Sequence, residues 1–246
     1  MQSMASSSVS VAAIPERRRP AAIEFVRQIF VVMVKDLRAE FRTKEAINAS
    51  LAFALVILLL FSFAFEEETT RDISGGLLWI VFAFAGTLIL NRSFAREQPN
   101  DCLDALIAAP VPAAALFLGK ALANYFLVLA VELVSLPVFG IFHNVNWTRQ
   151  FWQLMVVVAL GTWALTVIGT IFSALTVNIR LREVMLPMLT YPILIPALLA
   201  AMMLTTDLVA GKPIGPDTVS WLKMLIGFDI IYTAVSVVLV EVILVG

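Results

Sequence analysis

Long apolar runs, separated by short charged or polar segments, dominate the chain from residue 46 onward. Each run has roughly the 20 residues that an α-helix needs to cross the hydrocarbon core of a bilayer. The runs do not alternate apolar and polar residues, so transmembrane β-strands are not expected. We predict six membrane-spanning helices, at about residues 46–65, 73–91, 116–142, 151–179, 184–206 and 221–245.

The segment before the first run has a different pattern. Apolar residues such as Ile23, Val26 and Phe30 recur every three or four positions, as on one face of a helix, but charged residues interrupt them too often for a span. We predict an amphipathic helix at residues 23–44 that lies along the membrane surface with its basic face toward lipid headgroups. A helix packed on a partner protein is the alternative. Residues 1–22 contain no apolar block, which predicts a disordered tail instead of a cleaved signal peptide, with a transit peptide as the alternative.

The composition indicates the same class. Hydrophobic residues make up 61% of the chain and charged residues 14%, whereas a soluble domain is nearer to about half and a quarter. The net charge of −1 gives no electrostatic reason to expect nucleic acid as a partner, and the single cysteine, Cys102, excludes an internal disulfide framework. We therefore predict an all-α integral membrane protein, with a tail at residues 1–22 and one membrane domain at residues 23–246.

Basic residues are distributed unevenly between the two predicted sides of the membrane. Of the 17 Lys and Arg residues, eight precede the first span, three lie between the second and third, and two lie between the fourth and fifth. Because basic segments stay on the cytoplasmic side, both termini are predicted to be cytoplasmic. Tryptophans at the opposite ends of the spans are expected to lie at the headgroup level. They are Trp79, Trp147, Trp152 and Trp221.

Motifs for catalysis and metal binding are scarce. The Gly-Lys pairs at residues 119–120 and 211–212 lack the upstream glycine and the following hydroxyl of a phosphate-binding loop, so no ATP hydrolysis by that mechanism is expected. The only histidine, His143, is interpreted as a solvated polar residue at the outer end of the third span, with haem ligation as the weaker alternative. We predict no catalytic residue, no metal and no directly bound cofactor.

Polar residues inside the spans are the first candidates for function. Asn124, Glu132 and Asp229 lie within predicted spans, where acids are costly and must face the bundle interior, a cavity or a partner. Structural hydrogen bonding is the competing interpretation. An intramembrane enzyme would require a second catalytic group beside Glu132 or Asp229, and no such group accompanies them.

Proline and small residues shape two of the spans. Three prolines in the span at 184–206 predict a bent helix near the bundle centre, because proline removes a backbone hydrogen bond. They are Pro187, Pro192 and Pro196. A moving gate and a plain packing irregularity remain equal interpretations of the bend. In the span at 151–179, Gly161, Gly169 and Ser173 are expected to allow close helix approach.

The link between the second and third spans, residues 91–110, has the pattern of a short helix. The Pro-Asn-Asp at residues 99–101 can begin and cap one, and Pro110 would end it. Leu103, Leu106 and Ile107 would give this helix an apolar face. A short cytoplasmic helix of this kind suits docking into a groove on a partner.

Several segments, this link included, together match the pattern of a known family. They are residues 90–97 (LNRSFARE), 103–106 (LDAL), 116–124 (LFLGKALAN), 132–137 (ELVSLP), 186–196 (LPMLTYPILIP) and 228–229 (FD), with Pro110. From about Phe25 to its end, the chain resembles CcmB, also called haem exporter protein B. That family is the membrane permease subunit of the cytochrome c maturation ABC transporter.

The resemblance implies a type-2 ABC transporter permease fold with six spans, with the helix at 23–44 as its lead-in helix. It implies a bacterial inner-membrane complex of two permease copies with an ATP-binding ABC subunit that carries ATP and Mg²⁺, a haem-handling membrane subunit and a small one-span subunit. ATP hydrolysis on the partner would drive haem export or release of a haem-loaded periplasmic chaperone, and the lack of haem ligands favours release. The alternative is a permease of the same fold that exports another amphiphile, a drug or a lipid.

In that family the link between the second and third spans couples to the ATPase. The corresponding residues here are Arg96, Glu97, Asp101, Leu103 and Asp104. The family usually has glycine where Cys102 stands, and a more charged stretch at residues 98–100. The start of this coupling helix is therefore expected to differ.

Overall fold

In the computed structural model of the protein, residues 21–95, 111–143, 147–177, 179 and 181–245 are described, and every regular element in these ranges is a helix. In chain order the helices are α1 (Ala21–Thr43), α2 (Glu45–Ala64), α3 (Glu67–Asp72), α4 (Ser74–Leu90), α6 (Ala113–Phe142), α7 (Phe151–Thr176), α8 (Arg182–Val209) and α9 (Val219–Val245). The predicted all-α membrane class is confirmed.

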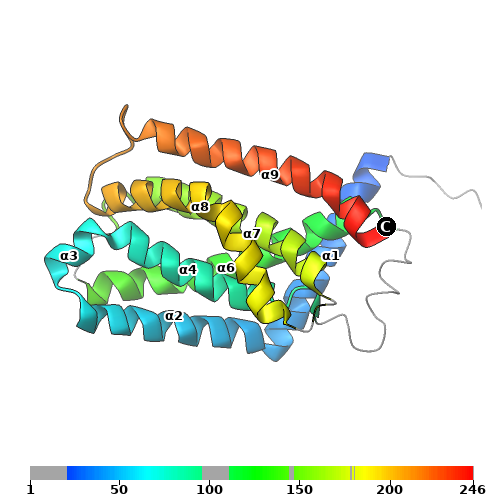
Figure 1. Ribbon diagram of the computed structural model, residues 1–246, viewed down its shortest axis with the longest axis horizontal. Helices are drawn as coiled ribbons and strands as arrows, with labels where there is room; N and C mark the ends of the chain where they lie inside the picture. Colours follow the sequence, from blue (N-terminus) through cyan, green and yellow to red (C-terminus); the bar gives the residue numbers. More distant parts are fainter. Residues whose placement is uncertain (1–20, 96–110, 144–146, 178, 180, 246) are drawn as a thin grey trace, which may run out of the picture.

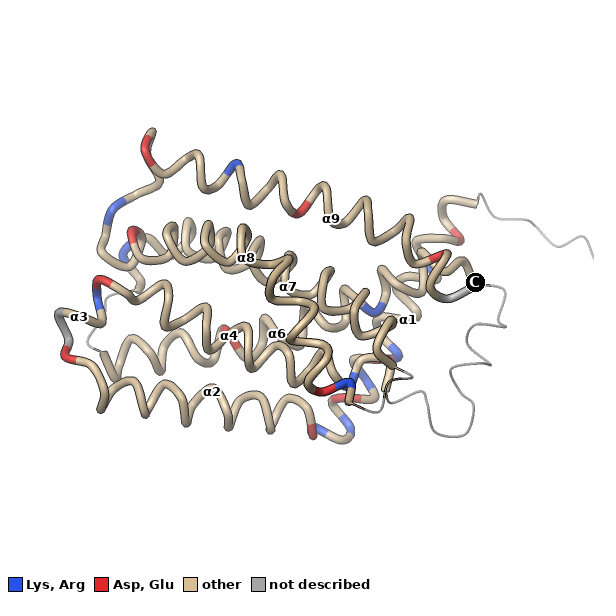
Figure 2. The backbone as a smooth tube through the Cα atoms, viewed as in Figure 1, with Lys and Arg blue, Asp and Glu red and all other residues tan. Residues whose placement is uncertain are grey.

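Helices α2, α4, α6, α7, α8 and α9 run side by side as a bundle, as Figure 1 shows. Helix α1 crosses one end of this bundle at a steep angle, and the short helix α3 lies at the other. We call these ends the α1 end and the α3 end. Charged residues gather at the two ends and along α1, which leaves the sides of the bundle almost entirely apolar (Figure 2).

Among the described helices, α2, α6, α7, α8 and α9 are long and apolar enough to cross a membrane. Helix α4 is apolar but has only 17 residues, a length of about 26 Å. The six-span count therefore stays a prediction. Helix ends differ from the predicted ones by a few residues: α6 begins at Ala113 and α7 ends at Thr176. Helix α3 forms where a loop was expected.

The core contains residues of all six bundle helices, and most residues of α4 and α7 are buried in it. A side chain at Gly161 would come within 2.0 Å of the Trp79 ring, and one at Gly169 within 2.3 Å of Leu90. Ser173 donates a hydrogen bond of 2.8 Å to the Leu90 carbonyl. Small residues on α7 thus let the large side chains of α4 reach its backbone, which confirms the predicted close approach.

Trp79 does not have the interfacial place that the sequence predicted for it. Its side chain is fully buried, and its Nε1 donates a hydrogen bond of 2.9 Å to Thr205 Oγ1 of α8. The headgroup interpretation was therefore wrong for this residue. The reason is that Thr205 inside the bundle supplies the polar contact that headgroups would otherwise give. Trp152, by contrast, is 80% exposed.

Helix α1 packs along α6. Its buried Val32 lies against Gly119, where an added Cβ would meet Val32 Cβ at 2.7 Å and the Ile29 carbonyl at 2.8 Å. At the far end of α1, the fully buried Glu40 accepts hydrogen bonds from the first backbone N–H groups of α2, which fixes the turn between the helices. That α1 lies along the membrane surface stays a prediction. Its acidic residues Asp36 and Glu40 face the protein.

A candidate functional site at the α1 end of the bundle

A buried lysine joins three parts of the chain at the α1 end. The Lys120 ammonium, on α6, donates 3.1 Å hydrogen bonds to Asp36 Oδ2 of α1 and to the Ser93 carbonyl beyond α4. It also lies 4.7 Å from the centre of the Phe94 ring. The side chain is fully buried. A charge can stay inside an apolar helix packing because these three partners replace water.

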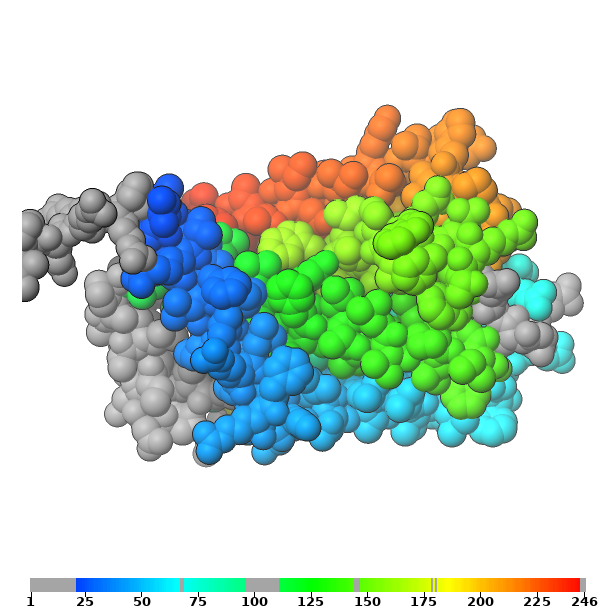
Figure 3. Space-filling view, turned by 180° about the vertical axis from the view of Figure 1, so that it is seen from behind, coloured from blue at the N-terminus to red at the C-terminus, as the bar shows by residue number. Residues whose placement is uncertain are grey.

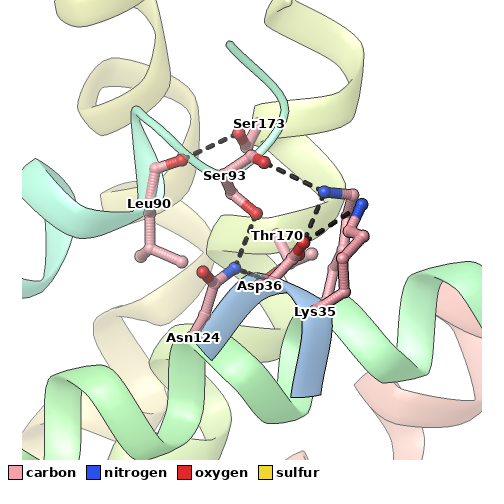
Figure 4. Close-up of polar contacts among 8 residues, drawn as sticks. Lys35, Asp36, Leu90, Ser93, Asn124, Thr170 and Ser173 are labelled. Atoms are coloured by element: carbon pink, nitrogen blue, oxygen red, sulfur yellow. Dashed lines mark hydrogen bonds and ion pairs between the residues drawn. The ribbon is translucent and has the colours of Figure 1, made fainter. Parts of the chain in front are cut away.

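Asn124 lies one turn further along α6 and extends the same network. Its Nδ2 donates hydrogen bonds of 2.9 Å to Ser93 Oγ and to Thr170 Oγ1 of α7. The seven labelled residues of Figure 4 show how the end of α4 is held between α1, α6 and α7. We call Asp36, Ser93, Lys120, Asn124, Thr170 and Ser173 the Lys120 cluster.

A small cavity opens beside the Lys120 cluster. It has a volume of about 200 Å³ and is lined by Lys35, Asp36, Glu40, Arg92, Ser93 and Asn124, among others. Arg92, just after α4, forms an ion pair of 2.6 Å with Glu45 at the start of α2. Arg92 and Ser93 are therefore attached by polar contacts to α2 and α6, and Lys120 and Asn124 extend these contacts to α1 and α7.

The predicted ATPase-coupling residues follow directly after this anchored segment. Arg96, Glu97, Asp101, Leu103 and Asp104, and also Cys102, lie outside the residues that the structure describes. Their role stays a prediction. The structure shows the segment just before these residues, where contacts through the Lys120 cluster and the Arg92–Glu45 pair join residues 92–93 to four helices, directly or through one side chain.

The three intramembrane polar candidates lie in separate surroundings. Asn124 belongs to the Lys120 cluster, and Glu132 is two turns away on α6, about 12 Å along the helix axis. Glu132 is buried and accepts a hydrogen bond from Thr162 of α7. Asp229, on α9, is 7% exposed, and neither carboxyl oxygen has a hydrogen-bond partner among the described residues. The structure therefore does not bring the three together.

The prolines of α8 lie within one continuous helix, which changes direction along its length in Figure 1. Pro187 borders a cavity of about 780 Å³ between α2, α4 and α8, which Glu45, Arg92 and Arg182 also line. One turn further on, the Tyr191 hydroxyl lies 2.9 Å from Thr87 Oγ1 of α4. The bent helix therefore contacts the same end of α4 that the Lys120 cluster holds.

His143 is not the solvated residue that the sequence suggested. Its side chain is buried, stacks on the Phe139 ring at 4.5 Å, and has Nδ1 3.2 Å from the Phe139 carbonyl. Burial lowers the pKa of the imidazole, and the contact with the Phe139 carbonyl opposes this only in part. Across the described ranges, no three His, Cys, Asp or Glu side chains gather closely enough to hold a metal ion.

Comparison with known proteins identifies the family. Residues 27–241 match the family model described as CcmB protein. The chain belongs to the CcmB family. It is 32% identical to heme exporter protein B of Rhodobacter capsulatus over 170 residues, which are 68% of this chain and 78% of that protein. The corresponding protein of Paracoccus denitrificans is 31% identical over the same shares, and that of Pseudomonas aeruginosa is 28% identical over 69% and 76%.

The region matched by the CcmB model includes every residue of the Lys120 cluster, together with Glu132 and Asp229. Sequence reasoning found Asn124 but not Asp36, Ser93 or Lys120 as parts of one site. One signal was present for α1: Val32, Asp36 and Glu40 are spaced four apart, so they share a helix face. In the structure this face is turned toward the protein, and Asp36 on it contacts Lys120.

Proposed function

We propose that this protein is the membrane permease subunit of an ABC transporter complex for c-type cytochrome biogenesis. ATP hydrolysis on a partner subunit would be coupled to haem export or to release of the haem-loaded periplasmic chaperone. The observation that carries the proposal is membership of the CcmB family, with relatives whose name is heme exporter protein B. The apolar helices of the bundle support a role within the membrane.

The proposed topology has six spans, including the short α4, in a bacterial inner membrane with the α1 end facing the cytoplasm. The bias of the basic residues toward that end supports it. The link at residues 96–110 would then face the cytoplasm, where an ATP-binding subunit could contact Arg96, Glu97, Asp101, Leu103 and Asp104. Two copies of this chain, a haem-handling membrane subunit and a small one-span subunit complete the proposed complex.

The Lys120 cluster supplies a route from such a contact into the membrane. A push on the link moves Ser93 and Phe94, which the Lys120 side chain contacts directly. Lys120 transfers that motion to α1 through Asp36, and Asn124 transfers it to α7 through Thr170. The chain itself would hydrolyse no ATP.

Release of the chaperone is the mechanism that the polar residues favour. Haem export through this chain requires groups that bind an iron porphyrin, and histidine is the common axial ligand. His143 is buried against Phe139, so it could reach a haem iron only after a rearrangement.

Deletion of the gene tests the proposal. We expect covalent haem in c-type cytochromes to disappear and to return with the wild-type chain on a plasmid. The state of the periplasmic chaperone separates the two mechanisms: it stays haem-free if this protein exports haem, and accumulates haem-loaded if this protein drives release. Normal c-type cytochromes in the deletion strain would exclude the proposal and favour export of another amphiphile.

A further inference from the structure

A groove lies on the side of the bundle between α7 and α9. It has a volume of about 590 Å³ and is lined by Trp163, Asp229, Ile230, Thr233, Ala234 and Val237. The view from behind in Figure 3 shows part of α7 between the green surface of α6 and the red and orange surface of α9. Ile230 and Ala234 of the groove are exposed, so the groove opens to the surroundings of the bundle.

Asp229 is the one acidic residue among those that line this groove, and its position is energetically costly. It lies 10 residues from the first residue of α9, which places it about 15 Å along the helix from the α3 end. At that depth lipids offer only hydrocarbon, and lipid headgroups are out of reach. A carboxyl group in such surroundings needs a hydrogen-bond donor.

The described residues around Asp229 do not supply that donor. Both of its oxygens lack a partner, although the residue is 93% buried, the complement of its 7% exposure. Trp163 has the only side-chain N–H among the groove residues, and it donates to Thr233 Oγ1 at 3.0 Å. Glu132, at a similar depth on α6, differs because Thr162 donates to it.

The surface around the groove allows another helix to approach closely. Gly227 has no atom within 4 Å of where a Cβ would be, and Ala234 is small and exposed. Ile230, which borders the groove, is 66% exposed. Small residues beside a polar one are typical of helix interfaces in membranes.

We propose that this groove receives a transmembrane helix of a different subunit, which places a hydrogen-bond-donating side chain against Asp229. A second copy of this chain fits less well. A two-fold symmetric contact would place the same surface of a second copy against the groove, and the one side-chain N–H of that surface, on Trp163, already donates to Thr233. The occupant is therefore a helix with about 20 apolar residues and one Ser, Thr, Asn, Gln, Tyr, Trp, Lys or Arg near its middle.

Photo-crosslinking from α9 tests the proposal in native membranes. A photoreactive amino acid is placed at Ile230, which lines the groove, or at Ile231 as a matched control. The two residues are of the same type, lie at nearly the same depth and are 66% and 59% exposed, but Ile231 is about 100° further around the helix from Asp229. We expect at least fivefold more protein adduct from position 230, with the crosslinked peptide of the partner in an apolar segment that contains a donor.

Substitution of Asp229 links the adduct to the carboxyl group. Asp229→Leu should reduce the adduct from position 230 at least fivefold, whereas Asp229→Asn, which keeps a carbonyl acceptor, should retain at least half. Equal adducts at positions 230 and 231, an adduct with a second copy of this chain, or an adduct unchanged by Asp229→Leu would each overturn the proposal. If the leucine variant fails to accumulate, the comparison of positions 230 and 231 in the otherwise unchanged chain decides. None of these outcomes depends on what the complex transports.

Discussion

Lys120 and Asp229 are both buried charged residues, yet their surroundings differ. Lys120 has an acid, a carbonyl and an aromatic ring as partners, all from its own chain. Asp229 has no partner among the described residues. At the residue scale, the first arrangement is complete in a single copy of the protein, and the second indicates a contact that a single copy does not contain.

Removal of Lys120 from its pair with Asp36 tests whether this buried pair stabilises a single copy of the protein. Lys120→Met should lower the free energy of unfolding by about 1–3 kcal/mol, because Asp36 and the Ser93 carbonyl lose a buried donor, although Asp36 keeps its ion pair with Lys35. Addition of Asp36→Asn to Lys120→Met should restore part of the loss. Thermal midpoints of the purified protein in detergent provide the measurement.

Lys212→Met is the matched control for that experiment. Lys212 also forms an ion pair, with Asp207 at 3.4 Å, but its side chain is 73% exposed. Exposed pairs contribute less than about 1 kcal/mol, so its midpoint should hardly change. Equal losses for the Lys120 and Lys212 variants would show that the buried pair has no special role.

At the scale of helices, α4 and α7 pack so closely that the residues of their contact are fixed by steric fit. Trp79 is held on one side by its bond to Thr205 and on the other by the backbone at Gly161. Gly169 and Leu90 repeat the pattern two turns further along α7. The two helices therefore form the buried centre of the bundle, against which α2, α8 and α9 pack.

Gly161→Ala should destabilise this centre by about 1–3 kcal/mol, because the new methyl group would overlap the Trp79 ring, which is fully buried and cannot move aside. Gly227→Ala on α9 makes the same chemical change in open space and should be neutral or stabilising, since alanine favours the helix by up to about 1 kcal/mol. Thermal unfolding of both variants in one detergent should show a lower midpoint for Gly161→Ala and an unchanged or higher midpoint for Gly227→Ala.

The helices were predictable from sequence, and the Lys120 cluster was not. Continuous apolar runs predicted the membrane helices to within a few residues, because a span needs an uninterrupted apolar stretch. Lys120 stands at the edge of such a run, where a boundary charge and a buried charge have the same pattern. Only the position of Asp36, 84 residues earlier in the chain, distinguishes the two. Trp79 was misplaced for the same reason, since its partner lies 126 residues away.

At the scale of the whole molecule, the Lys120 cluster and α3 lie at opposite ends of the bundle. The link at residues 96–110 follows the Lys120 cluster at the α1 end, whereas His143 and α3 lie toward the other end. Helices α4, α6 and α7 run between these places. These three helices therefore connect the Lys120 cluster with the α3 end of the bundle.

Charge reversal in the link tests where the ATP-binding partner docks. Glu97→Lys together with Asp104→Lys should reduce the ATP-binding subunit that co-purifies with this chain at least tenfold, because both charges belong to the predicted contact. Asp217→Lys, beyond α8 at the α3 end, is the control and should leave the association unchanged. An intact, fully coupled complex after the double reversal would contradict the docking assignment.

The shortness of α4 has a consequence for the lipids around the protein. Its 17 residues span about 26 Å, whereas a bilayer core is about 30 Å thick. Most of α4 is buried, but Ile80, Phe84 and Leu88 are exposed along one face. Along this face the bilayer core is thicker than the helix is long, and local thinning of the neighbouring bilayer relieves that hydrophobic mismatch.

The reconstituted complex should therefore respond to acyl-chain length. Its ATP hydrolysis is expected to be fastest in bilayers thinner than about 30 Å and to fall as the chains lengthen. The isolated ATP-binding subunit serves as the control, since it has no span to match. A thicker bilayer raises the energetic cost of the mismatch at α4. The thickness of the membrane would then help to set how readily the transporter changes conformation.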